Sequence, residues 1–213
     1  MLFENREQAA RLIAGRLTHL RGKNPLVLAI PRGAVPMARI IGDSLGGEVD
    51  VVLVRKLGFP GNAETAMGAV DEEGTVHLNG QLSEYGITKK YIEEEKENQL
   101  ATIRSRRRLY DTVHTRISPA KRIVIVVDDG SATGFTMIAA LEALRTQHPM
   151  KLIAAMGVAP PEVIKKIEKI ADEVLCIHIT ADFVAVGQFF RNFEQVSDEE
   201  VIQQLSYAGK KDI

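Results

Sequence analysis

Two adjacent aspartates stand where an apolar run gives way to small and hydroxyl-bearing residues. Asp128 and Asp129 follow residues 123–127, and the next seven residues read Gly-Ser-Ala-Thr-Gly-Phe-Thr. Small residues allow a tight bend in which several backbone N–H groups face one point. The start of a following helix adds further N–H groups and the positive end of its dipole. The segment 123–137 is therefore predicted to bind a phosphate dianion.

The acidic pair adds a second kind of chemistry to this segment. Two carboxylates would repel a phosphate, so Asp128 and Asp129 are expected to bind another part of the ligand. Carboxylates accept hydrogen bonds, and a vicinal diol offers two donors at a suitable spacing. A phosphate and a diol on one small molecule indicate a ribose 5-phosphate. The predicted phosphate-binding residues are Gly130, Ser131, Ala132, Thr133, Gly134 and Thr136.

An ordinary turn is the structural alternative for this segment. In that interpretation Asp-Asp-Gly bends the chain, and the hydroxyl group of Ser131 or Thr133 caps the next helix. The whole combination at one strand-to-helix junction favours ligand binding instead. The segment is not a Walker loop, because it contains no Gly-Lys-Ser/Thr.

Two further segments place cations after predicted buried strands. Arg32 and Gly33 follow the first apolar run. Gly33 would let backbone N–H groups approach a charged ligand, and the guanidinium group of Arg32 would add a fork of hydrogen-bond donors. Arg55 and Lys56 follow the second apolar run, where cations require an anion or solvent. The alternative for Arg32 and Gly33 is a common turn. The alternative for Arg55 and Lys56 is a position at the solvated base of a loop. Ligands collect at the carboxyl ends of parallel strands, so these segments are expected to meet the acidic pair.

Residues 126–136 resemble the 5-phosphoribosyl-1-pyrophosphate (PRPP) signature of type I phosphoribosyltransferases. The resemblance implies that Asp128 and Asp129 hold the ribose hydroxyl groups as the catalytic pair and that the loop holds the 5′-phosphate. Residues 31–34 look like the pyrophosphate loop of this family. Residues 55–61 resemble a segment of adenine phosphoribosyltransferases, in which Arg-Lys leads into a mobile loop that closes over the substrate.

A phenylalanine-rich segment near the C-terminus resembles another part of the family. Residues 182–190 are similar to the hood of purine-type members, where an aromatic ring stacks on the base. Phe183, Phe189 and Phe190 are the candidates for this ring. Packing in the core is an alternative of equal weight for each of them.

The resemblance implies transfer of a 5-phosphoribosyl group from magnesium-bound PRPP to a nitrogen nucleophile, with release of pyrophosphate. A nucleobase is the favoured acceptor class, and Mg²⁺ is the implied cofactor. A regulatory protein that binds PRPP or a nucleotide without turnover needs the same residues and remains the alternative. A hydrolase of nucleosides or sugar phosphates on the same scaffold is a third interpretation.

One loop position bears on the acceptor. Hypoxanthine–guanine enzymes of the family carry an aspartate just before Thr-Gly, where it trades a proton with the purine. This chain has Ala132 there, as adenine enzymes do, and a methyl group cannot transfer a proton. Residues 183–190 are similar instead to the hypoxanthine–guanine hood. The acceptor therefore stays open.

The elements that must position these residues follow from apolar periodicity and from breaker residues. Helices are expected over residues 5–20, 35–45, 88–116, 136–145 and 161–170. Strands are expected over residues 26–30, 49–54, 122–127, 152–159 and 173–179. Residues 55–65 read as a loop, and residues 66–70 and 75–78 read as a short hairpin. The charge run of the helix 88–116 is interpreted as a solvated face.

Alternation of helices with buried apolar strands predicts an α/β fold with a parallel sheet flanked by helices. Residues 1–213 are expected to form one phosphoribosyltransferase-like domain. A helical insertion at about residues 80–118 and a small C-terminal hood at about residues 180–196 complete it. A homodimer is compatible with this organisation.

Composition excludes several other classes of protein. The net charge of −1 over 213 residues provides no broad field for nucleic acid or an anionic membrane. A single cysteine excludes an internal disulfide framework and is typical of a reducing cytoplasm. The five histidines share no metal-ligand spacing, so no protein-only metal site is expected. No signal peptide or membrane-spanning run is recognised.

Overall fold

A computed structural model describes residues 2–78 and 86–208, with only the backbone described at residues 62–65 and 207–208. The start of the helical insertion predicted over residues 80–118 lies partly outside these residues. The helices are α1 Arg6–Arg16, α2 Val35–Leu45, α3 Lys89–Tyr110, α4 Phe135–Arg145, α5 Pro161–Ile167 and α6 Asp198–Ala208. The strands are β1 Leu26–Ala29, β2 Glu48–Val51, β3 Val54–Phe59, β4 Asn62–Asp71, β5 Val76–Leu78, β6 Ile123–Gly130, β7 Lys151–Ala159 and β8 Glu173–Ile179.

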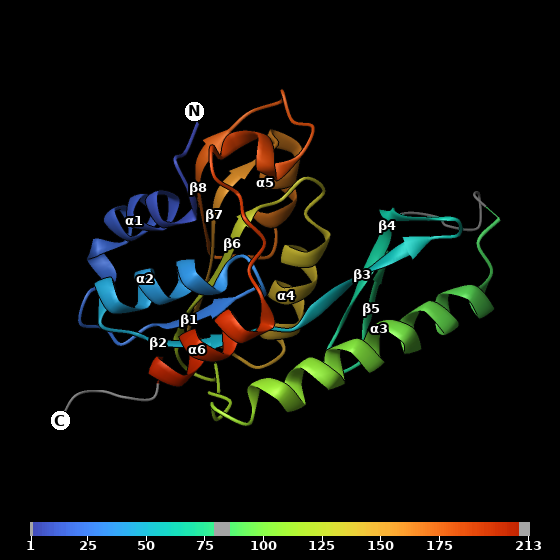
Figure 1. Cartoon of the computed structure of the whole chain (residues 1–213), viewed down its shortest axis with the longest axis horizontal. Coiled ribbons are helices and arrows are strands. Elements are labelled where there is room, and N and C mark those ends of the chain that lie inside the picture. Colours follow the sequence, from blue (N-terminus) through green and yellow to red (C-terminus); the bar gives the residue numbers. More distant parts are fainter. Residues whose placement is uncertain (1, 79–85, 209–213) are drawn as a thin grey trace.

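The larger sheet is parallel throughout. Its strands run in the order β2-β1-β6-β7-β8, and each neighbouring pair is parallel. Helices α1 and α2 cover one face, and α4 and α5 cover the other (Figure 1). The predicted fold class, a parallel sheet flanked by helices, is confirmed.

Strand β6 shows why this sheet forms. Ile125 and Val127 pack into the core on the α1 and α2 side, whereas Val124 and Val126 pack into the core on the α4 and α5 side. Alternate residues point to opposite faces of a strand, so a continuous apolar run fills both cores. Each fully buried side chain of this kind contributes about 1.5–3 kcal/mol of transfer free energy. The strand continues to Gly130, past the predicted end at residue 127, so its ladder also positions the acidic pair.

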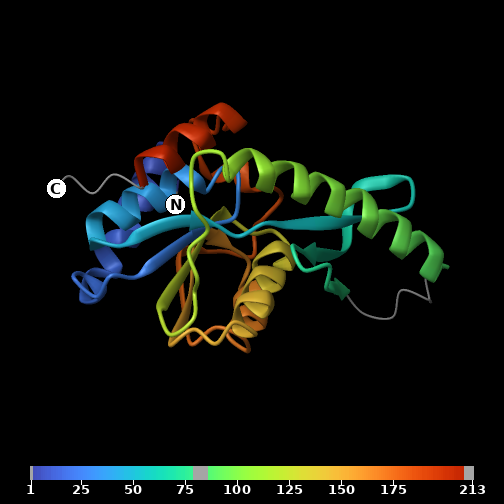
Figure 2. The same cartoon turned by 90° about the horizontal axis from the view of Figure 1, so that it is seen from below.

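The loop predicted over residues 55–65 is wrong. Strands β3, β4 and β5 form a separate antiparallel sheet, which extends with α3 to one side of the parallel sheet (Figure 2). Phe59 pairs with Asn62, so Pro60 and Gly61 are the two central residues of a tight turn, and Gly61 has a positive φ of 74°. Pro followed by Gly is typical of a type II turn. The breaker residues therefore mark a hairpin turn, and the hairpin predicted over residues 66–78 is the second half of this sheet.

Helix α3 covers the small sheet and ends earlier than predicted. Leu100, Ile103 and Tyr110 form its buried stripe, and the helix stops at Tyr110 instead of residue 116. Beyond that point the backbone N–H of Ile117 donates to the buried carboxylate of Asp50 (2.8 Å). This contact requires a non-helical chain after the helix.

Helix α6 was not predicted, although the sequence contains its signal. Ser197 and Glu200 exchange hydrogen bonds as a capping box: the Ser197 hydroxyl accepts from the Glu200 N–H (3.2 Å), and the Glu200 carboxylate accepts from the Ser197 N–H (2.7 Å). Val201 and Leu205, four residues apart, are fully buried. The helix packs against α2, β2 and α3.

The predicted hood region is anchored to the N-terminal segment. A short 3-10 turn, Val186–Phe189, follows β8, and Phe3 forms a parallel bridge with Phe190.

Among the described residues, none of the helices combines the length and apolar composition needed to span a bilayer.

Candidate functional site

The predicted phosphate-binding turn, residues 130–136, runs from the last residue of β6 into the first turn of α4. Gly134 is the N-cap of α4 and has a left-handed conformation (φ 87°), which glycine adopts without steric cost. No side chain caps the helix there, so the N-caps considered at Ser131 and Thr133 are wrong. The N–H groups of the first turn of α4 consequently have no partner within the helix and can meet an anion.

Ser131 does not face solvent and instead stabilises the loop through two hydrogen bonds. Its backbone N–H donates to the Val158 carbonyl (3.0 Å), and its hydroxyl oxygen accepts from the Gly134 N–H (3.1 Å). The Ser131 residue is only 5% exposed, whereas Ala132 and Thr133 are exposed and Thr136 is half-buried. The part of the turn that can meet a ligand is therefore residues 132–136.

The acidic pair has a partner from the opposite end of the chain. Arg6 of α1 donates through Nε to Asp129 Oδ2 (2.7 Å), and both side chains are largely buried. Arg6 also donates to the Glu194 carbonyl (2.6 Å) and lies over the Phe193 ring, 3.8 Å from its centroid. Arg6 was not predicted as a site residue, because an arginine in an amphipathic opening helix resembles any surface charge.

Burial raises the pKa values of both carboxyl groups of the acidic pair. Burial and the neighbouring charge of Asp129 raise the pKa of Asp128 well above its ordinary value of 3.8. Burial also raises the pKa of Asp129, against the opposing effect of Arg6. The positive charge of Lys56 opposes this rise in the pKa of Asp128.

The structure brings the predicted pyrophosphate loop against the acidic pair. A Cβ atom at Gly33 would clash with Asp129 Oδ2 and lie 3.0 Å from Arg6 Nε, so a side chain does not fit there without displacing that ion pair. The neighbour, Arg32, is directed to α6, where its Nη1 donates to Asp198 Oδ2 (3.3 Å). The peptide bond between Pro31 and Arg32 is cis.

A cavity of about 370 Å³ opens beside the phosphate-binding turn, within the usual volume range of ligand pockets. Its walls come from the end of β1, from β3, from α3 and from the first turn of α4. The lining residues are Ile30, Pro31, Val54, Arg55, Lys56, Gly58, Glu95, Gln99, Arg106 and Thr136.

Arg55 and Lys56 line this cavity from an element that was not predicted from the sequence. They lie inside β3 of the small sheet and not at the tip of a strand of the parallel sheet. Arg55 Nε donates to Gln99 Oε1 of α3 (2.9 Å), and Lys56 is exposed. The cations predicted for the site therefore line its cavity, but on a separate sheet that α3 supports.

Helix α3 also adds residues that the sequence analysis assigned to a solvated face. Arg106 lines the cavity, and its Nε lies 3.8 Å from Asp198 Oδ1. The buried residues Ile103 and Tyr110 lie three positions before and four positions after Arg106, which places it on their side of the helix. This spacing was the signal that could have identified Arg106.

The phenylalanine candidates divide into two groups. Phe189 and Phe190 are 7% and 5% exposed, so both rings pack in the core and offer no face to a base. Phe190 contacts Phe3 (5.1 Å between centroids) and Phe193 (5.0 Å). Phe183 is half-buried and packs on Phe189 (5.1 Å). Base stacking is therefore wrong for Phe189 and Phe190 and stays a prediction for Phe183.

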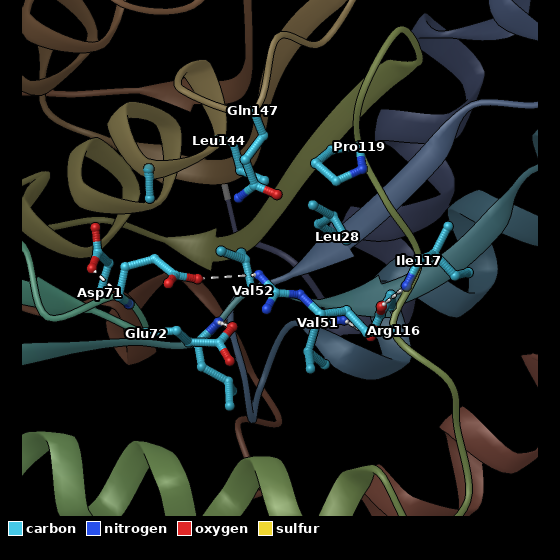
Figure 3. A pocket seen from close by; sticks show the side chains of 14 residues that line it. Leu28, Val51, Val52, Asp71, Glu72, Arg116, Ile117, Pro119, Leu144 and Gln147 are labelled. Carbon is cyan, nitrogen blue, oxygen red and sulfur yellow. Dashed lines mark hydrogen bonds and ion pairs between the residues drawn. The ribbon is translucent and has the colours of Figure 1, made fainter.

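A second pocket is too small for a nucleotide. It lies at the far end of α4, near Leu144 and Gln147, and has a volume of about 30 Å³, enough for one or two waters (Figure 3). Glu72, one of its lining residues, accepts a hydrogen bond from the Leu53 N–H (3.4 Å). This pocket belongs to the packing between the two sheets.

The family model described as the phosphoribosyl transferase domain matches residues 2–193, which contain the turn, the acidic pair and all the lining residues of the cavity. The chain belongs to the phosphoribosyl transferase domain family. The resemblance recognised in residues 126–136 is thereby confirmed.

Relatives of this phosphoribosyl transferase domain extend over nearly its whole length. Two curated proteins of Mycobacterium tuberculosis, strains CDC 1551 and H37Rv, are provisionally named phosphoribosyl transferases and are each 38% identical over 210 residues, 98% of the chain. The chain spans about half the length (47%) of these relatives. The crystal structure of TT1426 from Thermus thermophilus is also 38% identical, with a TM-score of 0.83, and the match covers 99% of this chain and 100% of that one.

Proposed function

We propose that this phosphoribosyl transferase domain transfers a 5-phosphoribosyl group from PRPP to a nitrogen nucleophile, with a nucleobase as the favoured class. The bond between the anomeric carbon and the pyrophosphate oxygen breaks, the carbon–nitrogen bond forms, and the nucleophile loses its proton. Bond breaking ahead of attack leaves positive charge on the ribose ring, which Asp128 and Asp129 stabilise. The observation that carries the proposal is the position of an acidic pair near the carboxyl end of β6 and of an uncapped helix start just after it, with a cation-lined cavity beside that helix start.

Each part of PRPP has a matching group in this arrangement. The turn at residues 130–136 binds the 5′-phosphate, mainly through Ala132, Thr133 and Thr136 and the N–H groups nearby. The pair binds the ribose hydroxyl groups, for which Asp129 must exchange its contact with Arg6. Arg55 and Lys56, which line the cavity, and Arg32, which directly follows the lining residue Pro31, bind the pyrophosphate, because they carry the opposite charge.

Mg²⁺ fits the residues present only if the ligand supplies most of the oxygen atoms that coordinate the ion. No group of three or more His, Cys, Asp or Glu side chains is arranged to hold a metal ion in residues 2–78 and 86–208. Mg²⁺ keeps several waters and binds through one or two carboxylates and substrate phosphates, so Asp128 and Asp129 would be its protein ligands. When bound, it neutralises charge on the leaving pyrophosphate.

The affinity for PRPP is expected to fall as the pH falls, starting well above the ordinary aspartate pKa. Both folded-state pKa values are raised, so the pair holds protons that free aspartate has lost. A protonated pair accepts hydrogen bonds from the diol poorly, and binding weakens as the pH drops through these raised values. Calorimetric Kd values between about pH 8 and about pH 5 measure the effect. Inorganic pyrophosphate, which has no diol, is the control, and an equal pH dependence for both ligands contradicts the prediction.

Guanine and hypoxanthine are expected to be poor acceptors. Ala132 is exposed in the loop and cannot exchange a proton with the purine. Pyrophosphate release from PRPP, measured with adenine, guanine, hypoxanthine, xanthine, orotate and uracil, tests both the reaction and this specificity. The variant Ala132→Asp is the matched comparison. A high kcat/KM of the unaltered protein on guanine means that a residue outside the loop supplies the proton transfer.

The same panel separates the alternatives. Release of ribose 5-phosphate without any base identifies a hydrolase. Tight binding of PRPP with no turnover on any acceptor identifies a regulatory protein. Either result overturns transfer as the function while leaving the PRPP site in place.

A further inference from the structure

Two arginines, Arg55 and Arg106, line the cavity, and a third, Arg32, directly follows the lining residue Pro31. Arg55 lies on β3, Arg32 follows β1, and Arg106 lies on α3, a helix that sequence analysis treated as solvated. Arg106 lines the same cavity as Thr136 of the phosphate-binding turn, and its side chain is only 21% exposed. The arginine is therefore held at the cavity wall and is not a freely solvated surface charge.

The carboxylates nearby do not balance this positive charge. Arg32 and Arg106 share a single carboxylate, Asp198, at 3.3 and 3.8 Å, and the same carboxylate accepts a hydrogen bond from the Tyr110 hydroxyl (2.9 Å). Arg55 donates to the neutral side chain of Gln99.

Glu95, the one acidic side chain among the described residues that line the cavity, already accepts two hydrogen bonds. It accepts from the Gly58 N–H (3.2 Å) and from the Gln99 amide (3.0 Å). Burial, followed by the charge of Arg106, lowers the pKa of Arg55, and the opposing charge of Glu95 offsets this only in part. The guanidinium groups therefore repel one another. An anion in the cavity would relieve this repulsion.

We infer that Arg106 is a pyrophosphate-binding residue, which the α3 insertion contributes to the site. The inference rests on the proposed function and extends it, because it assigns a ligand contact to a helix outside the turn, the acidic pair and the predicted pyrophosphate loop. A guanidinium group presents parallel N–H donors that match two phosphate oxygens. Asp198, which contacts both Arg106 and Arg32, lies beyond the family match at residues 2–193.

Binding of two separate probes tests this inference. Inorganic pyrophosphate probes the cation-lined cavity, and ribose 5-phosphate probes the turn and the acidic pair. The variants are Arg106→Gln, the charge-retaining Arg106→Lys, and the control Arg104→Gln, on the same helix with a side chain that is 62% exposed. Calorimetry gives both Kd values, and thermal unfolding shows that each variant is folded.

Arg106→Gln is expected to weaken pyrophosphate binding at least tenfold, which corresponds to about 1.4 kcal/mol, and to change ribose 5-phosphate binding less than twofold. Arg106→Lys should recover part of the loss, and Arg104→Gln should leave both Kd values unchanged. Unchanged pyrophosphate binding in Arg106→Gln overturns the inference, as does an equal loss of both ligands, which indicates a structural role. If the unaltered protein binds neither probe nor PRPP, the proposed function itself fails.

Discussion

Asp128→Asn together with Asp129→Asn is expected to lower kcat/KM for phosphoribosyl transfer at least 100-fold, which corresponds to about 2.7 kcal/mol of transition-state stabilisation. Amide groups keep the shape of the side chains but remove the negative charge that faces the ribose ring. Pyrophosphate release under steady-state conditions measures the effect. Asp43→Asn, an exposed position on α2, is the matched control. Activity of the double variant within tenfold of the unaltered protein contradicts the role of the pair.

The single variant Asp128→Asn is expected to stabilise the folded protein, in contrast to the loss of activity expected for the double variant. The pKa of Asp128 is raised in the folded state, so between its unfolded and folded pKa values the folded protein binds more protons than the unfolded chain. Stability then decreases as the pH rises through that window, and above the folded-state pKa the folded protein bears the full cost of the buried charge. Asparagine removes this cost, so the unfolding temperature at alkaline pH should rise. A lower unfolding temperature at alkaline pH would mean that the charge is well compensated.

Arg107→Ala is expected to lower the free energy of unfolding by about 3 kcal/mol, because it breaks a largely buried ion network. Arg107 donates to both carboxylate oxygens of Glu72 (2.8 and 2.7 Å) and lies 4.0 Å from the buried carboxylate of Asp50. Burial already raises the pKa of Asp50, and Arg107 is one of the charges that oppose this effect. Without Arg107, the two carboxylates remain buried with less compensation.

Chemical denaturation measures this loss, with Arg108→Ala as the control. Arg108 is the next residue of the same helix, is exposed, and costs the same change in helix propensity. A double-mutant cycle with Glu72→Gln isolates the pair. If Arg107→Ala destabilises the protein no more than Arg108→Ala, the network contributes little to folding.

The junction between β6 and α4 could be predicted because its signals are local. A buried apolar run, two carboxylates and a glycine at the helix start lie within 15 consecutive residues, and the family match extends over all of them. The same holds for the parallel sheet, whose strands are continuous apolar runs. Local patterns therefore predicted the fold class and the position of the turn between β6 and α4.

The rest of the site depends on contacts between distant residues. Arg6 and Asp129 are 123 positions apart, and nothing in either segment indicates their pairing. Residues 55–61 carry breakers that suit a loop as well as a hairpin turn, and the pairing of β3 with β4 and the packing of α3 decide between them. Phe189 and Phe190 have the residue type of a stacking ring, but their contacts with Phe3 and Phe193 place them in the core.

The separation of the molecule into two sheets has a consequence for its cooperativity. The cavity has one wall on the parallel sheet and another on the small sheet with α3, and only residues 52–53 separate β2 from β3 along the chain. A ligand that binds both walls stabilises only conformations in which both are folded and docked. Occupancy of the cavity should therefore merge two units of local unfolding into one and slow hydrogen exchange in β3 and β4 as strongly as in β6.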